Sequence, residues 1–358
     1  MIAKRVLAQF AIDTNECKVQ PFGTGLINQT WKIVCADNNY ILQRINHHIF
    51  LHPADIDDNI NQVSNYLAQH YPDYLFITPV AAAGGQTLLV TEEQEYFRMF
   101  PFIKDSVSYD VAPTPKVAFE AAKQFGKFTR LLTGLPVNLL KFTLPDFHNI
   151  SLRQTQFEEA IRNAEPEKLE EAEICIKELM DYRFIPERFE AIQNDPSFRK
   201  RITHHDTKIS NILFDKRGNG LCVIDLDTVM PGYFISDVGD MIRTYVCAVN
   251  EEEQDFSKIV IRDDYFGAIV KGYLSEMKDE LSITEMDHFV YAGLFMIYMQ
   301  AIRFLTDHLQ NDRYYNVSYK GQNLVRAMNQ ATLLRKLNEK TPLFEAMVKQ
   351  CTHAAVMP

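Results

Sequence analysis

The most informative run in this chain of 358 residues is His204-His205-Asp206-Thr207-Lys208-Ile209-Ser210-Asn211. Its spacing, H-x-D-x-K-x-x-N, is suited to phosphoryl transfer to a hydroxyl. The Asp accepts a proton from the attacking hydroxyl or orients it, and the Asn turns back to hold a metal on the phosphates. The Lys places positive charge beside the transferred group. We therefore predict Asp206 and Lys208 as catalytic residues and Asn211 as a metal ligand; the alternative is a polar loop that has this spacing by chance.

A second run follows at Cys222-Val223-Ile224-Asp225-Leu226-Asp227. It predicts an apolar strand that ends in an Asp, at the distance where kinase-like folds carry their main magnesium ligand. Magnesium prefers hard oxygen ligands and retains waters, so Asp225 with Asn211 forms a plausible minimal set. Leu226 and Asp227 stand where protein kinases have Phe-Gly, which indicates a small-molecule kinase. Asp227 is either a further metal ligand or a carboxylate held by backbone amides.

Asp237 belongs to a third run, Ser236-Asp237-Val238-Gly239-Asp240-Met241-Ile242-Arg243. Ser236 or Asp237 can cap the helix that this run begins. In a kinase-like lobe an Asp at this place also holds the backbone of the catalytic loop. We therefore predict a structural role for Asp237.

A glycine-containing run, Phe22-Gly23-Thr24-Gly25-Leu26-Ile27-Asn28-Gln29-Thr30, lies between two predicted strands. A strand on each side disfavours a Rossmann loop and favours a flap whose backbone amides lie over phosphates. The alternative is a simple turn. The candidate nucleotide contacts in this flap are Gly23, Thr24, Gly25 and Asn28.

Arg44 ends the third predicted strand, where protein kinases place the Lys that contacts the α- and β-phosphates. An arginine there stays charged and offers a fork of donors. The alternative is a surface cation at the end of a strand. As its acidic partner on the following helix, Asp58 fits best, with Asp55 and Asp57 as rivals.

Strand patterns are concentrated near the N-terminus, at 17–22, 29–35, 40–45, 87–90 and 96–100, with a helical pattern at 53–69. Helical patterns dominate beyond Pro101, at 115–132, 152–163, 167–191, 237–249, 256–277, 284–309 and 321–338, apart from a short hairpin at 212–224. We predict an α+β, protein-kinase-like fold with two lobes. Residues 1–101 form a nucleotide-binding lobe with a small antiparallel sheet and one main helix. Residues 102–358 form a larger, mostly helical lobe that carries catalysis and binds the acceptor.

Composition narrows the class of protein. Hydrophobic residues make up 46% of the chain, enough for a packed core. The formal net charge of -10 disfavours a nucleic-acid binder, which needs a basic surface. The nearly apolar run 289–299 is too short to span a bilayer, and we expect neither a membrane nor a protein partner. The six cysteines are scattered without metal spacing, which predicts buried or idle thiols in the cytoplasm.

Four segments together resemble the aminoglycoside phosphotransferase and choline kinase superfamily and, within it, the N-acetylhexosamine 1-kinase branch. They are FGTGLINQTW (22–31), YILQRINHHIF (40–50), HHDTKISNILFD (204–215) and CVIDLDTVMPGYFISDVGD (222–240). The resemblance runs from Pro21 to Arg326 and is most specific in the catalytic third. It implies ATP as donor with magnesium, and the anomeric hydroxyl of N-acetylglucosamine or N-acetylgalactosamine as acceptor.

The same resemblance implies roles for single residues. Asp206 is the catalytic Asp, Asn211 and Asp225 hold magnesium, and Arg44 takes the phosphate-binding place that is a Lys in many relatives. The family's hinge corresponds to Met99, Phe100 and the residues up to Phe102, whose backbone receives adenine. Two alternatives stay open: a kinase of the same fold for choline, homoserine or another sugar, and a nucleotide-binding pseudokinase.

The acceptor site is expected in the helical lobe, since a neutral sugar needs hydrogen-bonding groups and an apolar floor. Arg303 is the first candidate, because it is a charge among apolar residues on a helix suited to burial. Tyr314 and Tyr315, just past that helix, offer a stacking face and a hydroxyl. In the alternative, Arg303 pairs with Asp307 one turn on and binds no ligand.

Overall fold

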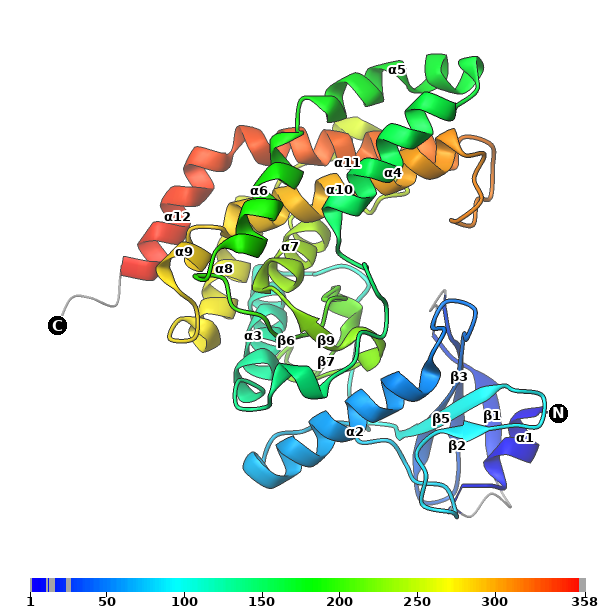
Figure 1. Ribbon diagram of the computed structural model, residues 1–358. Coiled ribbons are helices and arrows are strands. Elements are labelled where there is room, and N and C mark those ends of the chain that lie inside the picture. Colours follow the sequence, from blue (N-terminus) through cyan, green and yellow to red (C-terminus); the bar gives the residue numbers. More distant parts are fainter. Residues whose placement is uncertain (1, 11, 13–16, 24–26, 354–358) are drawn as a thin grey trace.

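The computed structural model describes residues 2–10, 12, 17–23 and 27–353. An antiparallel sheet lies at one end of the molecule and helices fill the other, which confirms the predicted α+β fold with two lobes (Figure 1). The strand order in the sheet is β1-β2-β3-β5-β4. The strands are β1 (Lys18–Pro21), β2 (Gln29–Val34), β3 (Asn39–Ile45), β4 (Leu89–Val90) and β5 (Tyr96–Pro101). β5 ends where the lobe boundary is predicted, and that boundary stays a prediction.

The two faces of the sheet differ because successive residues of a strand point to opposite sides. One face packs on α1 (Ile2–Leu7) through a small apolar core that includes Phe97. Residues that are directly paired across strands share a face. Arg44 is paired with Phe97 and therefore lies on this side. Gln43 and Arg98 are paired with each other and lie on the opposite side, which we call the interlobe face.

Helix α2 (Pro53–His70) joins the sheet to the helical lobe (Figure 1). Pro53 lies in its first turn, where the fixed φ of proline is already helical and no N–H is needed. Its buried apolar residues form one stripe and belong to the large core: Ile56, Ile60, Val63 and Leu67. Asn59 Nδ2 donates to the carbonyls of Lys141 (2.8 Å) and Val229 (3.0 Å). These bonds fix α2 against the helical lobe.

The helical lobe is built around α10 (Phe289–Leu309), which is buried along almost its whole length. This helix is long and apolar enough to cross a membrane, but 83% of its apolar window is buried in protein, as expected of a core helix. α7 (Phe234–Tyr245) approaches α10 closely at Gly239, where an added Cβ would lie 2.3 Å from the Ala292 carbonyl oxygen. The other helices are α3 (Pro115–Leu131), α4 (Ile150–Asn163), α5 (Pro166–Met180), α6 (Phe184–Asn194), α8 (Asp263–Met277), α9 (Ile283–Met286), α11 (Gln322–Glu339) and α12 (Thr341–His353).

Four predicted helices differ from the observed ones. The predicted helix 237–249 begins and ends earlier, as α7. The segment 167–191 forms α5 and α6, since Pro186 has no N–H and must lie in the first turn of a new helix. The segment 284–309 is divided between α9 and α10. The segment 256–277 becomes α-helical only at Asp263.

Two short antiparallel strand pairs lie in the helical lobe. β7 (Ile212–Phe214) pairs with β8 (Gly220–Val223), which confirms the predicted hairpin. β6 (Arg201–Thr203) pairs with β9 (Met230–Gly232), and neither was predicted because three residues are too few to show a period. The loops that follow β6 and β8 carry the two polar runs, so the strand pairs bring these runs together.

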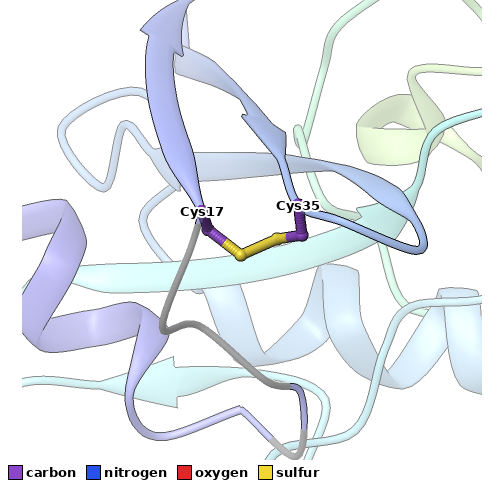
Figure 2. Close-up of a disulfide and its surroundings, with 2 residues drawn as sticks. All are labelled: Cys17 and Cys35. Atoms are coloured by element: carbon purple, nitrogen blue, oxygen red, sulfur yellow. A yellow bond between two sulfur atoms is a disulfide. The ribbon is translucent and has the colours of Figure 1, made fainter.

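Cys17 and Cys35 form a disulfide at the open end of the β1–β2 hairpin (Figure 2). The expectation of idle thiols is therefore wrong for these two residues. The strand register explains the pairing: Lys18 lies opposite Val34, so the residues just outside this pair are also neighbours.

Candidate functional site

The loop after β6 is fixed by the carboxylate of Asp237, in the first turn of α7. Asp237 Oδ2 accepts from the backbone N–H of His204 (3.1 Å), and Oδ1 accepts from that of His205 (2.7 Å). His205 has a φ of 66°, in the left-handed region, which a non-glycine residue adopts only when its surroundings hold it there. Burial raises the pKa of Asp237 to about 7, against the two N–H groups that favour its charged form. The prediction that Asp237 holds the backbone of the catalytic loop is confirmed, whereas the predicted cap at Ser236 or Asp237 is wrong, because α7 begins at Phe234 with Tyr233 as its N-cap.

Asp206 and Lys208 form the centre of the site. Lys208 Nζ lies 2.9 Å from Asp206 Oδ2 and 4.0 Å from Asp225 Oδ2. Burial alone would raise the pKa of Asp206, but the ammonium of Lys208 holds it below its usual value. Because 28% of the Asp206 side chain is exposed, an ionised carboxylate is accessible to a ligand here.

Asp225 lies at the end of β8, beside the catalytic loop. The Ile224 N–H donates to the Asn211 carbonyl (2.9 Å), and Asn211 Nδ2 donates to the Asp206 carbonyl (2.9 Å). Burial and the neighbouring carboxylate of Asp227 raise the pKa of Asp225 to about 6. These interactions bring Asn211 and Asp225 to one place.

Asn211, Asp225 and Asp227 present hard oxygens, which fit a magnesium ion. Two close carboxylates, with the pKa of Asp225 raised, suit a site that is completed by a cation. Within the described ranges, no group of three or more His, Cys, Asp or Glu residues is placed to hold a metal. This is consistent with the predicted set, which has only two carboxylates and relies on an amide.

Asp227 is almost fully buried and is held by side chains of the sheet lobe. Asn28 Nδ2 donates to Asp227 Oδ2 (2.7 Å), and the guanidinium of Arg98 forms an ion pair with Oδ1. The predicted alternative of backbone amides is therefore wrong, because side chains from the other lobe occupy both oxygens. Arg98 was not predicted for the site. Its sequence offers no motif, and only the register of β3 and β5 places it on the interlobe face.

The glycine-containing flap is only partly described. Thr24 and Gly25 fall outside the described residues, whereas Gly23 has a φ of 79°, which glycine adopts at no steric cost. Asn28, at the end of the flap, contacts Asp227 and also accepts from the Asn46 N–H through Oδ1 (3.0 Å). Asn28 therefore bridges the sheet to the helical lobe, and the phosphate contacts of the flap stay a prediction.

Arg44 is not brought to the site. It lies on the α1 side of the sheet and pairs with Glu95 at 2.5 Å. None of the three acidic residues proposed as its partner contacts it. Asp55 and Asp58 bind Lys141 (2.9 and 2.6 Å), and Asp57 accepts from the hydroxyl of Thr87.

The predicted hinge at Met99–Phe102 connects β5 to the helical lobe. The Met99 carbonyl accepts from Val80 N–H (2.7 Å), and Phe102 N–H donates to the Asn39 carbonyl (2.9 Å). The Phe100 ring lies on the interlobe face, 5.2 Å from the guanidinium of Arg98. Adenine binding by this segment stays a prediction.

Arg303, on α10, is surrounded by aromatic rings. Its guanidinium carbon lies 5.6 Å from the ring centre of Tyr315, 5.9 Å from that of Tyr314 and 6.0 Å from that of Phe147. Asp307 instead accepts from the backbone N–H groups of Tyr314 and Tyr315, both at 2.8 Å. The alternative in which Arg303 pairs with Asp307 is therefore wrong.

His148 connects this aromatic group to the catalytic loop. Its ring lies 4.4 Å from that of Phe147 and 5.4 Å from that of His205, which precedes Asp206. Burial lowers the pKa of His148, as do the neighbouring His205 and Arg303, so the ring is neutral at pH 7. The only signal in the sequence is weak: Phe147 and His148 belong to the run Asp146-Phe147-His148-Asn149, which is polar among apolar residues.

The phosphotransferase enzyme family matches residues 18–259 of the chain. A microcompartment-associated aminopropanol kinase has a TM-score of 0.59 at 13% identity, over 96% of this chain and 98% of that chain. A spectinomycin phosphotransferase in complex with ADP and spectinomycin has a TM-score of 0.60 at 11% identity, over 95% and 97%. Choline kinase from Cryptosporidium parvum Iowa II has a TM-score of 0.56 at 13% identity, over 96% of each chain. At such identities the structural similarity shows the fold alone.

Proposed function

The chain belongs to the phosphotransferase enzyme family, and on that basis we propose that it is a kinase that uses ATP. From the resemblance of its catalytic segments to the N-acetylhexosamine 1-kinase branch, we propose that it transfers the γ-phosphoryl group to the anomeric hydroxyl of an N-acetylhexosamine. The products are the 1-phosphates of N-acetylglucosamine and N-acetylgalactosamine. The proposal places the enzyme in the cytoplasm, where ATP is available, acting on a small molecule.

The observation that carries the proposal is the geometry of Asp206, Lys208 and Asp225. The Asp206 carboxylate is ionised and accessible, so it can orient the acceptor hydroxyl and take its proton. Lys208 lies between the two carboxylates and places positive charge where the phosphoryl group passes. Asn211 and Asp225 would hold magnesium in this proposal, Asp227 would join them only through the Oδ1 that Arg98 now contacts, and the ion would neutralise phosphate charge.

The surroundings of Arg303 favour a neutral acceptor over an amine. Within the described part of the chain, no carboxylate lies within ion-pair distance of Arg303. A guanidinium that is not neutralised by a carboxylate repels a cationic acceptor but donates to hydroxyl and carbonyl oxygens, such as those of an acetamido group. The rings of Tyr315 and Phe147 add apolar faces against which a sugar can lie.

Phosphorus NMR of the reaction with ATP tests the acceptor. The panel contains N-acetylglucosamine, N-acetylgalactosamine, glucose, galactose and choline. We expect an anomeric phosphate signal from the two acetamido sugars. Glucose and galactose should react more slowly, on the order of a hundredfold or more, because polar groups that bind the acetamido group are left unpaired. A 6-phosphate product, or turnover with choline alone, removes the hexosamine assignment and leaves the kinase.

Variants of Arg303 test the residue that we assign to the acceptor. Arg303→Ala should raise the KM for N-acetylglucosamine about 10-fold or more and leave the KM for ATP unchanged. Arg313→Ala is the matched control, since Arg313 is exposed and lies close by in the sequence. ATP binding without transfer to any acceptor would instead indicate a pseudokinase, although the complete set of Asp206, Lys208, Asn211 and Asp225 speaks against this.

A further inference from the structure

We propose that Arg98, held in position by Gln43, is the side chain that binds the nucleotide phosphates. The inference rests on the proposed function, in that ATP is the donor. It assigns to a residue of β5 the task that the sequence placed on Arg44 of β3.

The faces of the sheet give the first argument. Arg44 lies opposite Phe97, which is fully buried in the small core under α1. Gln43, its neighbour in sequence, faces the catalytic residues but carries no charge. Arg98 lies opposite Gln43 and supplies positive charge on the interlobe face, where it contacts Asp227.

Lys32 is a rival cation. It is paired with Ile41, which lies two residues before Gln43 in β3, so Lys32 also lies on the interlobe face. Its ammonium lies 3.6 Å from the ring centre of Phe102, in the predicted hinge. That contact places Lys32 near the adenine end of the predicted nucleotide site. Arg98 instead contacts a carboxylate of the metal set, where the phosphates are expected.

The unfinished hydrogen bonding of Arg98 gives the second argument. Its side chain is 2% exposed, its Nε donates to Gln43 Oε1 (3.0 Å), and one terminal nitrogen contacts Asp227. The other terminal nitrogen, Nη1, is buried and has no hydrogen-bond partner among the residues that the structure describes. A guanidinium has five donors in a planar fork, and a buried donor without a partner is costly. A phosphate accepts two such donors at once, so it would complete the bonding of Arg98.

Gln43 explains how the guanidinium is aimed. Gln43 Nε2 lies 3.5 Å from the Thr30 hydroxyl, and its Oε1 takes the Nε donor of Arg98. A row of polar side chains thus crosses β2, β3 and β5 and ends at Asp227. Without nucleotide, Asp227 balances the charge of Arg98. With nucleotide bound, phosphate oxygens would neutralise part of the charge of Arg98, so neither its guanidinium nor the Asp227 carboxylate would be buried without a partner.

In the competing interpretation Arg98 is a strut: it links the two lobes through Asp227 and does not contact nucleotide. The two interpretations differ in what they predict for ligands with and without phosphates. We would measure the affinities of ADP and adenosine by calorimetry, without acceptor and in the presence of EDTA, so that neither turnover nor metal binding contributes. The proteins are the wild type, Arg98→Met, Arg98→Lys, Gln43→Leu and the control Arg44→Met, which is altered on the opposite face.

We expect Arg98→Met to weaken ADP about 10- to 100-fold and to leave adenosine within about twofold. Arg98→Lys should recover part of the loss, because it keeps the charge without the fork. Gln43→Leu should weaken ADP less than Arg98→Met does, and Arg44→Met should match the wild type. If Arg98→Met does not fold, the ratio of ADP to adenosine affinity in Arg98→Lys and Gln43→Leu decides.

Equal losses for ADP and adenosine, or an unchanged ADP affinity, would overturn the assignment and leave Arg98 as a strut. A wild-type chain that binds neither ligand would overturn the proposed function itself. A wild type that binds both, with no selective loss in the variants, would overturn only the role of Arg98.

Discussion

The loop that carries Asp206 and the sheet that carries Arg98 position their charged groups by different physical means. In the loop, local backbone geometry does so: His205 has a left-handed φ, and Asp237 binds two consecutive amides. In the sheet, the alternation of side chains along a strand determines which face a charged group lies on: Gln43 and Arg44 are neighbours in sequence but lie on opposite faces. A group in the loop is therefore recognised from its spacing along the chain, whereas a group in the sheet depends on the register of the strands.

The two regions also differ in what they depend on. Lys208 and Asn211 both donate to Asp206, and the carbonyl of Thr207, within the same loop, accepts from the Tyr245 hydroxyl of α7, so these bonds all lie within the helical lobe. Arg98 and Asn28 reach across to Asp227, so their geometry exists only when the lobes are together. We therefore expect substitutions in the loop to change the chemistry and substitutions on the interlobe face to change nucleotide binding.

The largest effect is expected for Asp206→Asn. The variant should fold and bind ATP, but kcat should fall about 100- to 10,000-fold, because the group that orients the hydroxyl and accepts its proton is neutralised. Steady-state kinetics with the preferred acceptor measures this. Asp279→Asn is the control, since Asp279 is an exposed carboxylate on the surface of the helical lobe. Near-normal turnover of Asp206→Asn would remove Asp206 from the chemistry.

Asp225→Ala should act on the nucleotide and not on the acceptor. We expect the affinity for ATP in magnesium to fall by about 100-fold, because the triphosphate loses the carboxylate that fixes its cation. The affinity for ADP in EDTA should stay within about twofold of the wild type, since that complex involves no metal. Calorimetric titrations under both conditions measure the difference. An equal loss in EDTA would show that Asp225 shapes the site and does not hold a metal.

The sequence predicts the site residues of the loop better than those of the sheet. Asp206, Lys208 and Asn211 are close in the chain, and the structure brings them together with Asp225 as the spacing predicts. Arg98 could not be found this way, because a shift of one residue in register moves a strand side chain to the other face. The register also decides the Cys17–Cys35 pair, which the wide spacing of the cysteines concealed.

Asp237→Ala tests whether the loop is held by its own lobe. It should lower the free energy of unfolding by about 1–3 kcal/mol for each of the two buried N–H groups that lose their acceptor. Chemical denaturation measures this cost. Asp264→Ala is the matched control, since Asp264 also lies in the first turn of a helix, α8, but is exposed. Its cost should be below about 1 kcal/mol. Equal costs for the two variants would mean that Asp237 does not support the loop.

The smallest effect is expected for Arg44→Met, and it bears most directly on the comparison of the two faces. Arg44 and Glu95 form an ion pair whose side chains are 32% and 21% exposed. Pairs that solvent reaches contribute about 0–1 kcal/mol, so the free energy of unfolding should change by no more than that.

The KM for ATP in Arg44→Met should stay within about twofold of the wild type. Arg44 lies on the α1 face, and the hydrogen-bonded strands of the sheet separate it from the interlobe face, where the phosphates are expected. Steady-state kinetics at saturating acceptor measures this KM. The sequence alone predicts the opposite, since Arg44 stands where a phosphate-binding cation is expected. A rise in the KM for ATP of tenfold or more, with the free energy of unfolding unchanged, would mean that β3 is shifted by one residue. That shift would exchange the faces of Gln43 and Arg44, and the role proposed for Arg98 would then fall to Arg44.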